Sequence, residues 1–229
     1  MNNPQALNLV IKTFTEILNA HDVCALKKVL TSDPMLNNWQ MDRSKYPELQ
    51  LQLTADDIST LVDDKLDKDL RLHADLSACL ETPLEKLLYA LAWKNGDLQK
   101  VGHIIKGAIQ AGQSTSLTNG PGQVFKQFGR HLADRSESIV DQHVLRAFEL
   151  YELYKQNEFP SPDDVTAIRK KINWDKDVVC ITSYKTWLKT QFSKRQRSEL
   201  GFVVNIDMVL FALGRAIKIT RTRGNGEQD

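Results

Sequence analysis

The sequence predicts an all-α protein. Apolar residues recur at spacings of three and four along most of the chain, beginning with the stripe from Leu7 to Leu18, and this period is typical of amphipathic helices. Several apolar runs follow residues that cap helices. The alternation typical of strands is confined to Val178–Thr182 and Phe202–Val204, so little or no sheet is expected.

The N-terminal quarter contains three predictable helices and one irregular stretch. After the helix around Leu7–Leu18, a short helix is expected over Val23–Leu30. Residues 33–53 contain two prolines and two asparagines, and are expected to be irregular. Thr54 then provides a cap for the run ADDISTLVDDKL, whose early aspartates favour the positive end of a helix.

Thr82 begins the most complete helix signal in the chain. It supplies a capping hydroxyl, Pro83 occupies the first helical position, and Glu85 completes a capping box. This helix should stop at Asn95–Gly96, and a further one should run from Asp97 to near Gly112. The remaining helices are expected at 122–133, 137–157, 162–172, 182–197 and 203–218, and the tail Gly224–Asp229 is expected to be flexible.

Composition places the chain among ordinary globular proteins. Its 229 residues are 41% hydrophobic and 26% charged, which excludes fibrous and wholly disordered classes. No apolar run is long enough for a membrane span, and the N-terminus lacks the pattern of a signal peptide. We therefore expect a cytoplasmic protein with no membrane partner.

Cysteine and histidine usage predicts no metal site and no cofactor. Cys24, Cys79 and Cys180 are far apart and odd in number, which argues against a disulfide framework or a zinc knuckle. They are expected to be small buried residues. The histidines show no ligand spacing with one another or with cysteine.

Charge is unevenly distributed although the net charge is only +1. Residues 169–223 carry 13 Lys or Arg against four acidic residues, a local excess of +9. Within this region the lysines and arginines are interleaved with four aromatic residues, Trp174, Tyr184, Trp187 and Phe192. This pattern has two interpretations. It is typical of a surface that binds nucleic acid, and it is also expected for a helix that buries an aromatic stripe and exposes a basic face to solvent.

A glycine turn opens the helix expected at 122–133. Gly120-Pro121-Gly122 precedes that helix, and the first amides of a helix have no intrahelical partners and suit a phosphate group. A turn of this composition is also a common connection between helices.

The segment after this turn carries a family resemblance. Residues 140–146 read VDQHVLR and so match a VDxHVxR motif at five positions, Val140, Asp141, His143, Val144 and Arg146. Gly122 precedes Asp141 by nineteen residues. The segment resembles helix-hairpin-helix DNA glycosylases of the endonuclease III superfamily, including 8-oxoguanine glycosylase-like bacterial proteins, as a divergent member. The resemblance covers about 35 residues. It implies a central lobe over 55–155, a second lobe from 1–54 plus 156–223, and a cleft between them.

The resemblance also implies a site. Asp141 takes the place of the catalytic aspartate, which would stabilise a sugar with positive charge or activate water. Tyr89 and Trp93 are candidates for stacking on the flipped base. The residues expected to contact double-stranded DNA are Gly120, Gly122, Gln123, Lys126, Arg130, His143 and Arg146.

Departures from the family narrow the expected chemistry. Bifunctional members carry a lysine nucleophile two residues after the second glycine, where this chain has Val124, and no cysteine quartet for an iron–sulfur cluster exists. Thr118 and Asn119 replace the apolar approach to the hairpin. The sequence therefore predicts either a monofunctional DNA N-glycosylase or a non-catalytic α-helical DNA-binding or protein-interaction protein that retains the fold.

Overall fold

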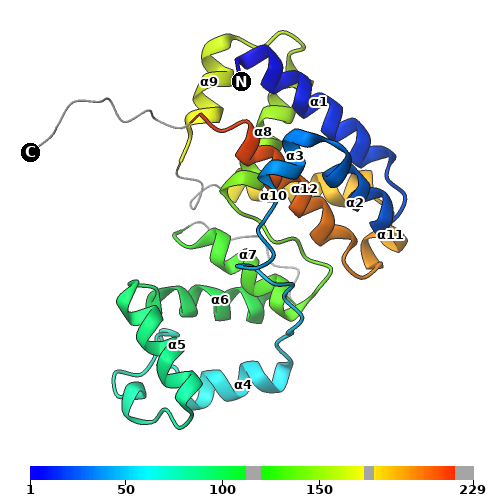
Figure 1. The fold of residues 1–229 in the computed structure, drawn as a ribbon. Coiled ribbons are helices and arrows are strands. Elements are labelled where there is room, and N and C mark those ends of the chain that lie inside the picture. The colour runs from blue at the N-terminus through cyan, green and yellow to red at the C-terminus, as the bar shows by residue number, and fades with distance from the viewer. Residues whose placement is uncertain (112–119, 173–177, 220–229) are drawn as a thin grey trace, which may run out of the picture. The chain divides into compact units, whose positions relative to one another are not determined.

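A computed structural model describes residues 1–111, 120–172 and 178–219, and these are helical with no strand, which confirms the all-α prediction (Figure 1). Within these ranges, β-pairing is limited to one isolated antiparallel bridge between Leu66 and Leu72. No helix in these ranges combines the length and apolar character needed to cross a bilayer. Thr118, Asn119 and the tail Gly224–Asp229 lie outside the described residues.

The chain divides into two compact units. Unit 1 comprises Met1–Asp42, Asp141–Trp174 and Asn205–Asp229, and unit 2 comprises Arg43–Val140 and Asp175–Val204. The division into glycosylase-like lobes stays a prediction, because a grouping of contacts does not establish that family's fold.

Unit 1 is built around the contact of its first helix with the helix that follows Asp141. Phe14 and Tyr151 stack across this contact with ring centroids 3.9 Å apart. The buried Arg169 donates to the carbonyls of Met1 and Ile217, which ties the chain start to the end of the last helix. Its helices are α1 (Asn3–Asn19), α2 (Val23–Ser32), α3 (Pro34–Trp39), α8 (Gln142–Gln156), α9 (Pro162–Lys170) and most of α12 (Phe202–Ala216).

Unit 2 centres on the close crossing of its two best-packed helices. A Cβ atom added at Gly107 would lie 1.8 Å from the Lys126 carbonyl oxygen, and one added at Gly129 would lie 1.8 Å from that of Ile104. The two backbones therefore approach to a distance that only glycine permits. The helices of unit 2 are α4 (Ala55–Asp64), a 3₁₀ turn (Leu76–Ala78), α5 (Pro83–Lys94), α6 (Leu98–Ala111), α7 (Gln123–Ala133), α10 (Val178–Gln191) and α11 (Lys194–Ser198).

The predicted caps of α4 and α5 are confirmed. Thr54 accepts from the Asp57 amide, Thr82 accepts from the Glu85 amide, and both form full capping boxes. Hydrogen bonds from Thr82 lower the pKa of the Glu85 carboxyl. These signals are local, because every partner lies within one helical turn.

Several expectations about boundaries are wrong. Residues 33–53 are not irregular throughout, because Asp33 caps the short helix α3 through the amides of Met35 and Leu36. The stretches 178–182 and 202–204, whose alternation hinted at strands, belong to α10 and α12. Helix α8 begins at Gln142 and not near 137, because Asp141 is its cap.

The cysteines and the C-terminal aromatics divide between exposed and buried positions. Cys24 and Cys79 are exposed, so the expectation that all three cysteines are buried holds only for Cys180. Of the aromatic side chains interleaved with basic residues, Tyr184, Trp187 and Phe192 are buried in the core, and Trp174 lies outside the described residues. Of the two readings of that pattern, the buried aromatic stripe is the one observed.

We predict that Gly129→Ala lowers the free energy of unfolding by about 1–3 kcal/mol, because the added methyl group forces α6 and α7 apart. Lys106→Ala, at an exposed position of α6, is the matched control and should stay within about 0.5 kcal/mol of wild type. Urea denaturation followed by circular dichroism measures both. Equal stability of the two variants would contradict a backbone contact at this crossing.

Candidate functional site

The glycine turn adopts the left-handed backbone that its residue types favour. Gly122 has φ +74° and precedes the first residue of α7, and Gly120 has φ +139°. A Cβ atom on Gly122 would lie 2.3 Å from the His103 ring. Both the backbone angle and the neighbouring ring therefore require glycine at position 122.

Two side chains from α7 turn back to the glycine turn. Gln123 donates from Nε2 to the Gly120 carbonyl at 2.8 Å, and a Cβ on Gly120 would be 4.0 Å from the Lys126 ammonium nitrogen. The turn thus combines a helix start with a neighbouring cation, and both features favour an anion.

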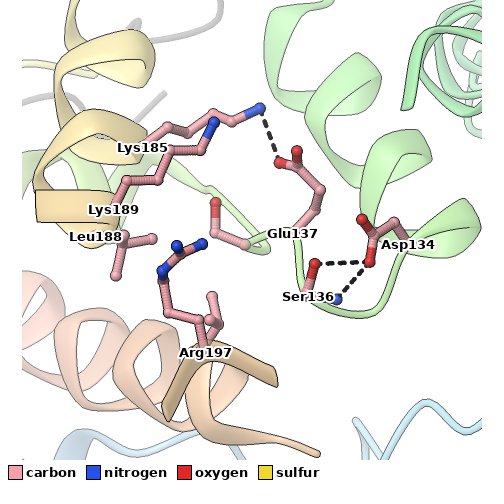
Figure 2. A pocket seen from close by; sticks show the side chains of 9 residues that line it. Asp134, Ser136, Glu137, Lys185, Leu188, Lys189 and Arg197 are labelled. Carbon is pink, nitrogen blue, oxygen red and sulfur yellow. Dashed lines mark hydrogen bonds and ion pairs between the residues drawn. The ribbon is translucent and has the colours of Figure 1, made fainter. Parts of the chain in front are cut away.

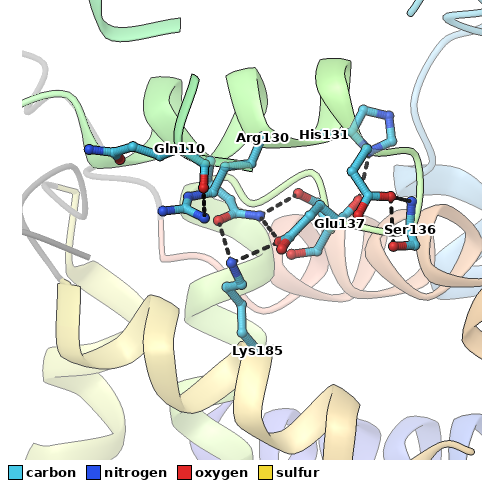
Figure 3. Close-up of polar contacts among 9 residues, drawn as sticks. Gln110, Arg130, His131, Ser136, Glu137 and Lys185 are labelled. Carbon is cyan, nitrogen blue, oxygen red and sulfur yellow. Dashed lines mark hydrogen bonds and ion pairs between the residues drawn. The ribbon is translucent and has the colours of Figure 1, made fainter. Parts of the chain in front are cut away.

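Arg130 and His131 lie further along α7 and are buried. Arg130 donates to the Gln110 carbonyl at 3.1 Å, so its described contact ties α7 to the end of α6 (Figure 3). His131 Nδ1 lies 2.7 Å from the Glu137 carbonyl oxygen. Because a carbonyl only accepts, Nδ1 carries the proton, and burial lowers the pKa of this imidazole. The ring is therefore neutral at pH 7.

A polar network joins α7, the following loop and α10 (Figure 3). Gln127 donates to the Glu137 carboxylate at 2.9 Å and to the Ser138 carbonyl at 3.1 Å. Lys185 pairs with Glu137 at 2.8 Å. Burial opposes ionisation of Glu137, but the charge of Lys185 and these hydrogen bonds outweigh it, so the pKa of the Glu137 carboxyl lies below its ordinary value.

Asp141 caps α8 through a single oxygen. Its Oδ1 accepts from the amides of His143 and Val144 at 2.7 and 2.8 Å, whereas no donor among the described residues contacts Oδ2. Burial raises the pKa of this carboxyl above its ordinary value, although the two amides and the charges of Arg146 and Arg215 act in the opposite direction. The two backbone hydrogen bonds thus fix the position of the carboxyl group through Oδ1.

His143 and Arg146 lie beside Asp141 on α8. The Arg146 guanidinium is fully buried and contacts His143 Nδ1 at 3.0 Å. Since a guanidinium only donates, Nδ1 accepts and the ring is unprotonated there. Burial, reinforced by the charges of Arg146 and Lys218, lowers the pKa of His143 to about 4. The described contacts of Arg146 are thus internal to unit 1.

The structure groups the predicted site residues in two sets. Asp141, His143 and Arg146 are together in unit 1. The turn residues and those of α7 are together in unit 2, which also contains Tyr89 and Trp93 on α5. Trp93 is exposed and Tyr89 is partly exposed. Stacking of either aromatic residue on a base near Asp141 stays a prediction.

Two clusters near these residues were missed by sequence reasoning. The Glu137–Lys185 ion pair joins segments far apart in the chain, so no local sequence pattern predicts it. In unit 1, Arg215 lies over the Trp39 ring at 5.1 Å and over the Phe211 ring at 5.6 Å. The HVLR and FALGR spacings could have suggested that α8 and α12 meet, since Gly214 permits close packing.

Comparisons with protein-family models, curated proteins and solved structures find no match to this chain. Among the described residues, no three His, Cys, Asp or Glu side chains gather to hold a metal ion.

We predict that the imidazole of His143 titrates with a midpoint near pH 4, well below the ordinary 6.5. Between about pH 6.5 and pH 4, His143 binds a proton in the unfolded chain but stays neutral in the folded protein. The free energy of unfolding therefore falls as pH is lowered through this range. NMR titration, with the signal assigned by its loss in His143→Gln, measures the midpoint. A midpoint above 6 would refute the buried, neutral ring.

Proposed function

We propose that this protein binds double-stranded DNA and excises a modified base as a monofunctional DNA N-glycosylase, with Asp141 as the catalytic carboxylate. The observation that carries the proposal is the state of Asp141: two amides hold Oδ1, and no described donor occupies Oδ2. The match to the VDxHVxR signature supplies the class of reaction.

The chemistry asked of Asp141 is electrostatic. A glycosylase extrudes its nucleotide from the stack, and the sugar gains positive charge as the bond to the base breaks. A carboxylate whose position is set in advance stabilises that charge, or orients the water that attacks the sugar, without having to reorganise. The two amides at Oδ1 also favour the ionised form against the effect of burial.

DNA binding is assigned to the glycine turn. Gly120 leaves space beside the start of α7, since a Cβ there would have the Lys126 ammonium as its nearest neighbour at 4.0 Å, whereas the space beside Gly122 is filled by the His103 ring. The other predicted DNA contacts have described hydrogen bonds within the protein and support the binding residues indirectly. Gln123 and Arg130 support the glycine turn and α7, and His143 and Arg146 support the Asp141 cap.

We predict that Asp141→Asn abolishes excision and spares both folding and duplex binding, because an amide can still cap α8 but lacks the negative charge. The assay is a panel of duplexes carrying alkylated, oxidised or deaminated bases, followed by hot alkali. Asp22→Asn, a change at the cap of α2, is the matched control and should retain full excision.

Two outcomes would count against the assignment of Asp141. Undiminished excision by Asp141→Asn would show that another group supplies the charge. Strand cleavage without alkali, or a covalent adduct trapped by borohydride, would show lyase chemistry that Val124 does not permit. Silence of the wild-type protein across the panel, with DNA binding intact, would favour the non-catalytic reading.

We predict that Lys126→Gln weakens duplex binding without changing sequence preference, and makes the salt dependence shallower by about one unit, because one phosphate contact is lost. Lys106→Gln, at an exposed position of the neighbouring helix, is the control and should keep the wild-type salt slope. Fluorescence anisotropy over a salt series measures both. Absence of duplex binding by wild type at low salt would overturn the proposal.

A further inference from the structure

Unit 2 contains a cavity of about 200 Å³ away from the glycine turn (Figure 2). Its walls come from the loop between α7 and α8, from α10 and from α11. The loop contributes Ser136, Glu137 and Ser138, and the two helices contribute Lys185, Lys189 and Arg197. Figure 2 shows the basic side chains on one side of this space and the loop on the other.

The charges around the cavity are unevenly compensated. Glu137 is neutralised by Lys185 at 2.8 Å. Asp134, at the far edge, accepts from the amide and the hydroxyl of Ser136. Lys189 and Arg197 have no carboxylate partner among the described residues. Lys189 and Arg197 therefore line a concave space without a described ion-pair partner, and with the Asp134 and Glu137 carboxylates counted the lining carries one positive charge in excess.

Arg197 is oriented by the protein. Its Nε donates to the Phe192 carbonyl at 3.2 Å, which leaves the two terminal nitrogens of the guanidinium for another acceptor. Such a planar fork suits the paired oxygens of a phosphate group, and Lys189 adds a point charge beside it.

A buried hydroxyl completes the lining. Ser138 is 1% exposed, and its Oγ has no hydrogen-bond partner among the described residues. A buried hydroxyl without a partner costs free energy, and rotation about one side-chain bond would let it donate to a ligand oxygen. The cavity thus combines two cations that have no ion-pair partner with a hydroxyl that has no hydrogen-bond partner among the described residues.

We propose that this cavity binds a phosphate group, held by Lys189 and Arg197, with Ser138 as an additional donor. A phosphate group offers oxygens to both Lys189 and Arg197 and fits within the volume. The group could belong to a small phosphorylated molecule or to the end of a nucleic acid strand, since both offer the same oxygens. This inference does not rest on glycosylase activity or on duplex binding by the turn.

The test is binding of three probes to the full chain, measured by calorimetry: inorganic phosphate, thymidine 5′-monophosphate, and a short oligonucleotide with or without a 5′-phosphate. Lys189→Gln/Arg197→Gln should weaken phosphate-dependent binding about tenfold or more. Lys194→Gln/Arg195→Gln removes the same charge from exposed positions of α11 outside the cavity, and should bind as wild type does. Lys189→Gln alone, which leaves the Arg197 hydrogen bond intact, should show a smaller loss.

Loss in the cavity variants and not in the control supports the site, and the probe that binds identifies the source of the phosphate. No binding of any probe by wild type, or equal losses in both double variants, overturns it. If none of the phosphate probes binds while duplex DNA still binds in a salt-dependent way, only the phosphate site in the cavity is refuted. If the probes bind and duplex DNA does not, only the proposed DNA contact at the glycine turn is refuted.

Discussion

The buried guanidinium of Arg146 holds unit 1 together at the place where Asp141 is positioned. It donates to the Lys171 carbonyl at 2.7 Å and to the Gly214 carbonyl at 3.4 Å, and so links α8 to the chain after α9 and to α12. A buried charge is tolerated only when it is well hydrogen-bonded. Gly214 makes this possible, because a Cβ there would lie 1.9 Å from the His143 carbonyl oxygen. The geometry of the Asp141 cap therefore depends on residues far from it in sequence.

Two partly buried carboxylates, Glu137 and Asp141, occupy opposite electrostatic environments. Glu137 has a lysine partner and an amide donor, and its pKa is lowered despite burial. Asp141 has only the backbone donors and more distant cations, and burial raises its pKa. The two shifts differ in sign because, of these two carboxylates, only Glu137 has an ion-pair partner among the described residues.

Local signals in the sequence predicted much of the fold, whereas contacts between distant segments did not follow from them. Thr54 and Thr82 cap their helices as expected because each partner is within three residues. The helix α3 escaped prediction because the prolines and asparagines around it suggested a loop, although Asp33 and Pro34 form a good helix start. The Lys185–Glu137 pair and the glycine crossing of α6 and α7 are tertiary, and no spacing in one sequence reveals them.

The order of the segments has a consequence for folding during synthesis. Unit 1 combines its N-terminal helices with the α8–α9 region and most of α12. Helix α1 is synthesised long before α8 and α9, on which it packs, so its apolar face stays without these partners during much of synthesis. Contacts of such high sequence separation slow folding and prolong exposure of apolar surface. Truncation before α12 would therefore leave unit 1 without a core element while most of unit 2 had already been made.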